Sequence, residues 1–310
     1  MLLGAIAQSI PDIDFIASFW LHPSENLLAH RGFTHSILFL LISTPFIAML
    51  AERWHRPHNI RLKRWMVFFG LQGLIHLFID GMNVYGVGWL EPFHHHRFAF
   101  NWIFVADPFF SIWPGLALLV LLILKRKDHR RQWWRRFGIG MSAIYLLYCG
   151  LNKAKIDSDT REIFSQQDIR WNDYFTTPTP LNNWLWYVVA ATDSGYYIGY
   201  RSLFDRQRTI DFHYVARNEH LLEPVKDHED LQKLIRFSKG FYSVANRNDT
   251  LVFSDLRFGE MIGWRDKGAP FVFYYYLRHP DDNQFLVQRG RFARWDRSAF
   301  QSLIRRIRGQ

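Results

Sequence analysis

The stretch HRGFTHSILFLLISTPFIAMLA, residues 30–51, joins a short histidine-containing motif directly to a long apolar run. The motif carries His30 and His35, and imidazoles are common metal ligands. The apolar run has the composition of a membrane helix, at the short end of the ~20 residues that a span needs. Ionisable groups at membrane depth are costly unless they are paired or functional. The sequence therefore predicts a functional site with ionisable side chains at the end of a membrane helix.

Further apolar runs occupy the first half of the chain, whereas the second half has the mixed polarity of a water-soluble domain. We predict an α-helical membrane bundle of about four transmembrane helices over residues 1–152, followed by a soluble α+β domain over residues 153–310. The alternative is a soluble bundle of four buried helices. The predicted spans are Ser36 to Ala51, Trp65 to Ile79, Pro108 to Leu124 and Phe137 to Leu151.

Aromatic and β-branched runs predict the strands of the second domain, with a hairpin turn at Asp193 to Gly195 and a helix near His228 to Ser238. The sole cysteine, Cys149, lies in the fourth predicted span and excludes an intrachain disulfide. The predicted strands are Trp184 to Ala191, Gly195 to Phe204, Ile210 to Ala216, Phe241 to Ala245, Thr250 to Leu256 and Phe271 to Leu277.

Lysine and arginine gather in two of the connections between the spans, and the intervening connection, Gly81 to Ala106, has only Arg97. The positive-inside rule places the two basic loops in the cytoplasm. Their excess of basic over acidic residues equals the net charge of the whole chain, +10. Topology thus explains a charge that would otherwise suggest nucleic-acid binding, and we expect no nucleic-acid partner. The basic residues are Arg53, Arg56, Arg61, Lys63, Arg64, Lys125, Arg126, Lys127, Arg130, Arg131, Arg135 and Arg136.

The same topology brings every candidate metal ligand, and the C-terminal domain, to the outer face of the membrane. Carboxylates and imidazoles together suit a divalent metal, with zinc as the first choice, and manganese, magnesium or a two-metal centre as alternatives. The candidate ligands are Asp12, Asp14, His30, His35, His76, Asp80 and Asp107.

Each motif also has a structural interpretation. Asp12 and Asp14 could cap a helix after Pro11. His76 and Asp80 are spaced i, i+4 and share one helix face, which suits either a shared ion or a carboxylate that orients an imidazole. Arg31, next to the permissive Gly32, could bind an anionic group such as phosphate.

These motifs, PDID, HRGFTHS, HLFID with GMNVYG, and FNWIFVADP, resemble those of the membrane-bound metal-dependent hydrolase family typified by the YdjM proteins. The resemblance covers about residues 2–155, and the later TPLNNWLW resembles longer members that carry an extra C-terminal domain. It implies a bacterial inner-membrane protein, and it adds Asn83 as a neighbour of the site beside His30 and Arg31. Members usually open with a helix bearing a Thr-His motif, and Met1 to Gly4 matches the point just after it. Either the start is assigned late or this member lacks that span.

We expect metal-assisted hydrolysis, because a bound divalent ion activates water and polarises a phosphoryl or acyl oxygen. Arg31 and Asn83 are the candidate catalytic residues beside the ligands. A site at the outer leaflet favours an amphipathic substrate, such as a phospholipid or a lipid-linked phosphate, and membrane lipid as a partner. The alternatives are a non-catalytic scaffold stabilised by metal and a small ion transporter that uses His76 and Asp80.

Overall fold

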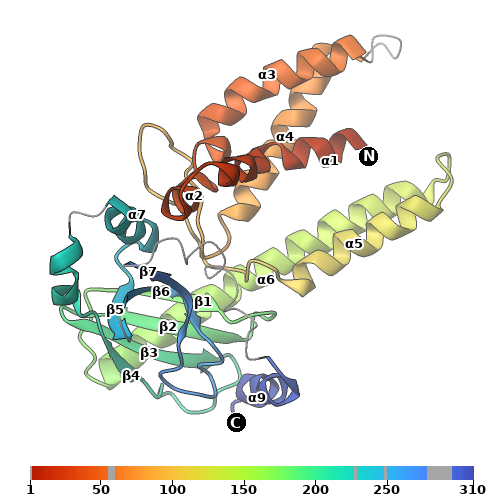
Figure 1. Cartoon of the computed structure of the whole chain (residues 1–310). Coiled ribbons are helices and arrows are strands. Elements are labelled where there is room, and N and C mark those ends of the chain that lie inside the picture. Colours follow the sequence, from red (N-terminus) through yellow and green to blue (C-terminus); the bar gives the residue numbers. More distant parts are fainter. Residues whose placement is uncertain (1, 55–59, 227–228, 248–249, 278–294) are drawn as a thin grey trace. The chain divides into compact units, whose positions relative to one another are not determined.

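The computed structural model describes residues 2–54, 60–226, 229–247, 250–277 and 295–310, which form two compact units (Figure 1). The first unit contains the N-terminal residues up to Phe100 and one helix from late in the chain. The second unit contains the remainder. The chain therefore leaves the first unit, returns to it for a single helix, and leaves it again.

A hairpin of two long helices forms the centre of the first unit (Figure 1). Gly73 lets these helices approach closely, because a Cβ atom there would lie 2.2 Å from a side-chain carbon of Leu40. Trp65 and Phe69 stack on each other at the other end of the hairpin, beside two alanines of the first helix. The elements of the unit are α1 (Leu2–Ser9), the 3-10 helix η1 (Pro11–Phe19), α2 (Pro23–Ala29), the 3-10 helix η2 (Phe33–His35), α3 (Ile37–Trp54), α4 (Leu62–Asp80) and α7 (Glu229–Ser238).

Within the described residues, α3 and α4 are the helices that are both long and apolar enough to cross a membrane. Only 17% of the apolar window of α3 and 22% of that of α4 is buried, which is unlike the core helix of a soluble protein. Large apolar side chains such as Leu41, Phe46 and Leu74 instead face outward. Both helices therefore have the surface that a lipid environment requires.

The third and fourth predicted spans have a different form. Helix α5 (Pro108–Ile123) is apolar but has only 16 residues, and the fourth run is the first part of α6 (Arg130–Gln166), a helix of 37 residues. The helix criteria therefore support two spans, and the predicted count of four is not established. The connection after α3 includes residues 55–59, so Arg56 lies outside the described residues.

Helix α6 runs without a break through residues 152–159, where we predicted the domain boundary. The hydropathy falls there, but the residues remain good helix formers. Lys153 pairs with Asp157 and Lys155 with Asp159, each one turn apart along the helix. A fall in hydropathy thus marks a change in what the helix packs against, and the helix itself continues.

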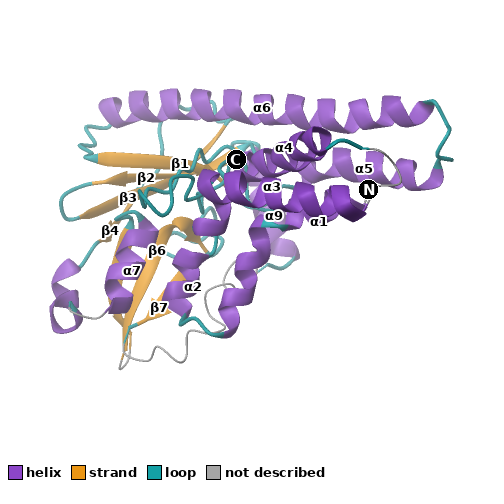
Figure 2. Cartoon of the chain, turned by 90° about the horizontal axis from the view of Figure 1, so that it is seen from above, coloured by secondary structure: helices purple, strands orange, loops and turns teal. Residues whose placement is uncertain are grey.

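The second unit is built on two antiparallel sheets, of order β1-β2-β3-β4 and β5-β6-β7. Side chains alternate along β2, so Tyr187 and Val189 pack into a core shared with the second sheet and α9. Val188 and Ala190 pack on the other face against the end of α6, which runs along the sheet (Figure 2). The strands are β1 (Asp173–Pro178), β2 (Leu185–Ala191), β3 (Gly195–Ser202), β4 (His213–Ala216), β5 (Tyr242–Arg247), β6 (Thr250–Glu260) and β7 (Phe271–Tyr276), with η4 (Glu219–Val225) and α9 (Arg297–Ile307).

The sheet-rich character of the later part of the chain is confirmed, and the predicted strands correspond to β2 to β7. The predicted helix corresponds to α7, although its expected first residue, His228, lies outside the described residues. Three elements, β1, η4 and α9, were not predicted from the sequence. Strand β1 pairs with β2 from Asp173 to Pro178, and its two threonines and proline gave no clear strand pattern.

Candidate metal centre

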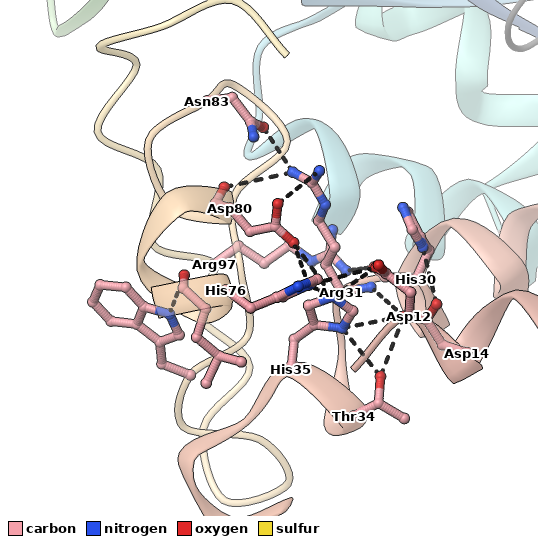
Figure 3. A network of polar contacts seen from close by, with 12 residues as sticks. Asp12, Asp14, His30, Arg31, Thr34, His35, His76, Asp80, Asn83 and Arg97 are labelled. Carbon is pink, nitrogen blue, oxygen red and sulfur yellow. Dashed lines mark hydrogen bonds and ion pairs between the residues drawn. The ribbon is translucent and has the colours of Figure 1, made fainter. Parts of the chain in front are cut away.

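Three elements of the first unit bring four polar side chains to one point (Figure 3). Asp12 lies in the first turn of η1, which Pro11 begins. His35 ends η2, the single turn that precedes α3. His76 and Asp80 lie one turn apart at the end of α4 and share one face. One donor atom from each of the four lies within 4.8 Å of all the others.

The donor atoms are spaced as a first coordination shell. The Nε2 atom of His35 lies 3.3 Å from Nε2 of His76, 3.4 Å from Oδ1 of Asp12 and 3.4 Å from Oδ2 of Asp80. The Nε2 atom of His76 lies 3.5 Å from the same oxygen of Asp12 and 3.3 Å from that of Asp80. Donors about 2.0–2.1 Å from a tetrahedral ion lie roughly 3.3–3.4 Å apart. These residues therefore fit a metal ion, with two nitrogen and two oxygen donors.

The four side chains differ in their access to solvent. The side chain of His35 is fully buried, and those of His76 and Asp80 are 12% and 16% exposed. The side chain of Asp12 is 50% exposed. The cluster therefore has one fully buried donor, two donors of intermediate burial, and one open side, which Asp12 occupies.

Asp14 sits behind the cluster and orients His35. Its buried carboxylate lies 3.2 Å from Nδ1 of His35 and 3.2 Å from Nδ1 of His30. It also accepts hydrogen bonds from the backbone N–H of Arg31 and the hydroxyl of Thr34. A carboxylate on the second nitrogen of a histidine fixes the ring and makes the first nitrogen a better ligand. Predicted as ligands, Asp14 and His30 instead lie in this outer layer of the site.

Arg31 and Asn83 hold the opposite side of the cluster. The Arg31 guanidinium lies 3.2 Å from Oδ1 of Asp80 and donates a hydrogen bond of 2.8 Å to Asn83, above the ring of Tyr85. These contacts leave Oδ2 of Asp80 pointing into the cluster (Figure 3). Arg31 has a φ of 57°, in the left-handed region, which costs a non-glycine residue free energy. The contacts of its backbone N–H with Asp14 and of its side chain with Asp80 stabilise that conformation.

The electrostatics of the site favour a bound cation. Hydrogen bonding to His35 holds the pKa of Asp12 well below its usual range. Burial opposes the same shift at Asp14, but hydrogen bonds from His30 and His35 outweigh it and also lower its pKa. Burial likewise opposes protonation of His35, yet the surrounding carboxylates raise its pKa to about 10. A buried group of ionised carboxylates thus holds positive charge at this point, and a divalent ion would replace the proton of His35.

Asp107, also predicted as a ligand, belongs to the second unit. Its carboxylate caps α5 by accepting hydrogen bonds from the backbone N–H groups of Phe109 and Phe110, and it accepts another from the Tyr145 hydroxyl. Burial raises its pKa. These contacts are those of a structural helix cap, and its role as a ligand stays a prediction.

Two residues of the site, Thr34 and Tyr85, were not predicted from the sequence. Thr34 contacts Asp14 and lies 3.1 Å from Nδ1 of His35, and its position within HRGFTHS, directly before the histidine, was the available signal. Tyr85 packs against Arg31 and lies two residues after Asn83 in GMNVYG. Neither residue type is a typical metal ligand, so a search for ligands passes over both.

Fold and site together define a membrane-helix protein with a histidine and carboxylate centre at the ends of its helices. Residues 1–156, half of the chain, match the family described as YdjM inner membrane protein, and this chain belongs to that family. All four clustered residues lie within the match, whereas the sheets lie beyond it.

Two curated relatives match part of the chain. Inner membrane protein YbcI of Escherichia coli (strain K12) is 28% identical over 158 residues, covering 44% of this chain and 84% of that protein. The uncharacterized protein YfhP of Bacillus subtilis (strain 168) is 29% identical over 138 residues, covering 40% of this chain and 41% of that protein. No solved structure matches the chain. The family description, the Escherichia coli relative and the two apolar helices support a location in a membrane.

Proposed function

We propose that this protein is a membrane-bound, metal-dependent hydrolase whose metal is held by His35, His76 and Asp80, with Asp12 at the exposed side of the same cluster. The observation that carries the proposal is the spacing of the four donor atoms, with His35 and His76 each 3.3–3.5 Å from both carboxylates. Zinc suits this set, because imidazoles and carboxylates at tetrahedral spacing are its ordinary ligands. Magnesium and manganese prefer six oxygen-rich ligands.

A bound zinc ion supplies Lewis acidity, which polarises a phosphoryl or acyl oxygen and lowers the pKa of water to about 7. The protein supplies the remaining functions. Asp12 occupies the exposed side, stays ionised and can accept the proton of an attacking water at its carboxylate. Arg31 and Asn83 act through Asp80 by holding the orientation of its carboxylate. We therefore assign them as positioning residues.

A lipid-like substrate with a phosphate or acyl ester is the proposed substrate class. The elements that carry Asp12 and His35 also carry exposed apolar side chains, namely Phe15, Phe19 and Trp20 in and after η1, and Phe33 in η2. Phe33 packs on Phe39 of α3, so this apolar surface continues that of the membrane helix. An amphipathic molecule could therefore reach the site from the membrane without crossing water.

We also propose that the protein crosses the inner membrane several times, with the site and the sheet unit in the periplasm, on the basis of the lysine and arginine distribution. Single cysteines at Lys127 and Glu223, in a Cys149→Ser background, test this arrangement with a membrane-impermeant maleimide on intact cells. We expect labelling at Glu223→Cys and none at Lys127→Cys. Labelling of the two positions in the opposite pattern would place the site in the cytoplasm.

A non-catalytic metal scaffold is the second candidate, and one observation favours it. Four protein donors at tetrahedral spacing close the coordination shell of a structural zinc site, whereas catalytic sites keep one position open. The exposed position of Asp12 distinguishes the two functions. In a hydrolase Asp12 is dispensable for holding the metal, and in a scaffold it is as necessary as Asp80.

Asp12→Ala and Asp80→Ala, made in the full chain and purified in detergent, test the proposal. We expect Asp12→Ala to retain zinc and lose cleavage of phosphodiester, phosphomonoester or acyl-ester lipids, and Asp80→Ala to lose the zinc itself. Equal loss of zinc in both variants favours the scaffold. A zinc-loaded wild-type protein that cleaves none of the lipid esters would also contradict the hydrolase.

A further inference from the structure

Helix α7 lies far from the metal centre in the sequence and beyond the family match, yet it packs within the first unit. Its Asp230 contacts the hydroxyl of Ser24, 206 residues earlier in the chain, and lies 3.4 Å from Nδ1 of His22. Lys233 forms an ion pair with Glu25 at 2.9 Å. These three partners lie at the start of α2, the helix that leads into the HRGFTHS motif.

Buried apolar residues support the docking of α7 more strongly than these polar contacts. Leu231, Leu234 and Phe237 are each 1% exposed, and they recur every three residues along one side of the helix. An exposed ion pair such as that of Lys233 with Glu25 stabilises a protein by only about 0–1 kcal/mol. The position of α7 therefore depends mainly on its apolar face.

Phe237 contacts two residues that lead to the metal centre. Its ring lies 6.5 Å from the ring of Tyr85, and the guanidinium of Arg97 lies over its face at 5.5 Å. Tyr85 in turn supports the guanidinium of Arg31, which holds Asp80.

Arg97 provides a second route from Phe237 to the site. It is buried, and its guanidinium donates hydrogen bonds to the backbone carbonyls of Leu28 and His30. Those carbonyls end α2 just before the turn that places Arg31 and His35. Phe237 thus connects to Asp80 through the side chains of Tyr85 and Arg31. It connects to His35 through Arg97 and the backbone of the HRGFTHS motif.

We propose that α7 is a positioning element of the metal centre, and that Phe237 is its principal positioning residue. This inference rests on the proposed function of the four-residue cluster as a metal site. Residues that support ligands from outside the first shell change metal affinity by about 10- to 100-fold. We therefore expect the part of the chain beyond the family match to set the affinity of the centre for its metal.

The test uses the full chain in detergent, with zinc alone as the probe and a competing chelator to measure the dissociation constant. Phe237→Ala should weaken zinc binding by about 10-fold. Leu303→Ala is the matched control, because Leu303 is 2% exposed in α9 of the second unit and its truncation also removes buried apolar atoms. It should lower the melting temperature and leave the zinc affinity unchanged.

A substitution at Tyr85 tests the proposed connection. Tyr85→Leu removes the aromatic ring between Phe237 and Arg31 and should weaken zinc binding less than Phe237→Ala does, because the route through Arg97 remains. Tyr85→Phe keeps the ring and should behave as wild type. Adding Tyr85→Leu to Phe237→Ala should have little further effect, because Tyr85 acts in series with Phe237 on the route to Arg31.

Hydrogen exchange of residues 28–36 in metal-free protein provides a readout that needs no metal. We expect faster exchange in Phe237→Ala than in Leu303→Ala. Wild-type protein that binds no zinc would contradict the proposed function. Faster exchange in Phe237→Ala would in that case still support the role of α7 in positioning residues 28–36. If zinc affinity and exchange were the same in Phe237→Ala and the Leu303→Ala control, the inference would be overturned.

Discussion

Buried ionisable groups are arranged differently in the two units. In the sheet unit two contacts each join one basic side chain with one carboxylate: Arg257 contacts both oxygens of Asp255 through Nε and Nη2, and Nε2 of His213 lies 2.8 Å from Glu260. In the first unit two histidines and two carboxylates share one point instead. A charge with one partner is neutralised and needs nothing further, whereas several donors around one point form a binding site. The number of groups that converge distinguishes a structural pair from a candidate site.

The largest expected effect breaks a pair in the sheet unit. Asp255→Ala leaves Arg257 buried without its carboxylate, and both side chains are at least 96% buried. Removing one partner of such a pair costs about 3–5 kcal/mol of the free energy of unfolding. We expect a lower midpoint of thermal unfolding, measured by circular dichroism, with the zinc content of the remaining folded protein unchanged. If Asp255→Ala lost zinc as well as stability, the pair in the sheet unit could not be called purely structural, and the contrast with the metal cluster of the first unit would fail.

His76→Ala removes one donor from the cluster. We expect zinc affinity to fall by more than about 100-fold, because loss of a direct ligand should exceed the 10- to 100-fold effect of an outer residue. His213→Ala is the matched control, since it removes a partly buried histidine that pairs with a carboxylate outside the cluster. Competition with a chelator measures both constants. Equal effects of the two substitutions would mean that His76 is a structural partner too.

Asp14→Ala should have a smaller effect on zinc binding. Its carboxylate contacts Nδ1 of His35 and is absent from the set of four clustered donors, so we expect a loss of about 10- to 100-fold with the metal still bound at high concentration. The same titration measures it. Complete loss of stoichiometric zinc would show that Asp14 is a direct ligand and does not belong to the outer layer.

Lys155→Ala should have the smallest effect. Lys155 pairs with Asp159 on an exposed face of α6, and such i, i+4 pairs contribute about 0.3–0.5 kcal/mol. We expect an unchanged zinc content and a change in unfolding midpoint close to the error of the experiment. A large loss of stability would show that surface pairs, and not buried ones, hold the second part of α6 in place.

Much of the site could be predicted from the sequence, because ligand residues are distinctive and occur in short motifs. Asp12, His35, His76 and Asp80 were all among the candidate ligands, and the lysine and arginine distribution predicted that the candidates lie on the same face of the membrane. The inner layer could not be separated from the outer one. Asp14 and His30 are as acidic or as basic as the clustered residues, and only the fold decides which nitrogen or oxygen faces the centre.

The fold was predictable where patterns are local. Runs of aromatic and β-branched residues predicted β2 to β7, and the segment near His228 to Ser238 was predicted as the helix that corresponds to α7. Two features depend on distant contacts and were not predicted. Helix α6 continues past Asn152 because its second part packs on the sheet, and α7 docks beside Ser24 across 206 residues of sequence. Neither contact leaves a signal in the segment itself.

The ratio of zinc to protein in the purified full chain tests the central claim most directly. The protein, dialysed against zinc in detergent and freed of unbound metal, should carry one equivalent by elemental analysis, and the His35→Ala/His76→Ala double variant should carry none. A wild-type protein without stoichiometric zinc, or a double variant with the same zinc content as wild type, would contradict the claim that these residues form a metal site.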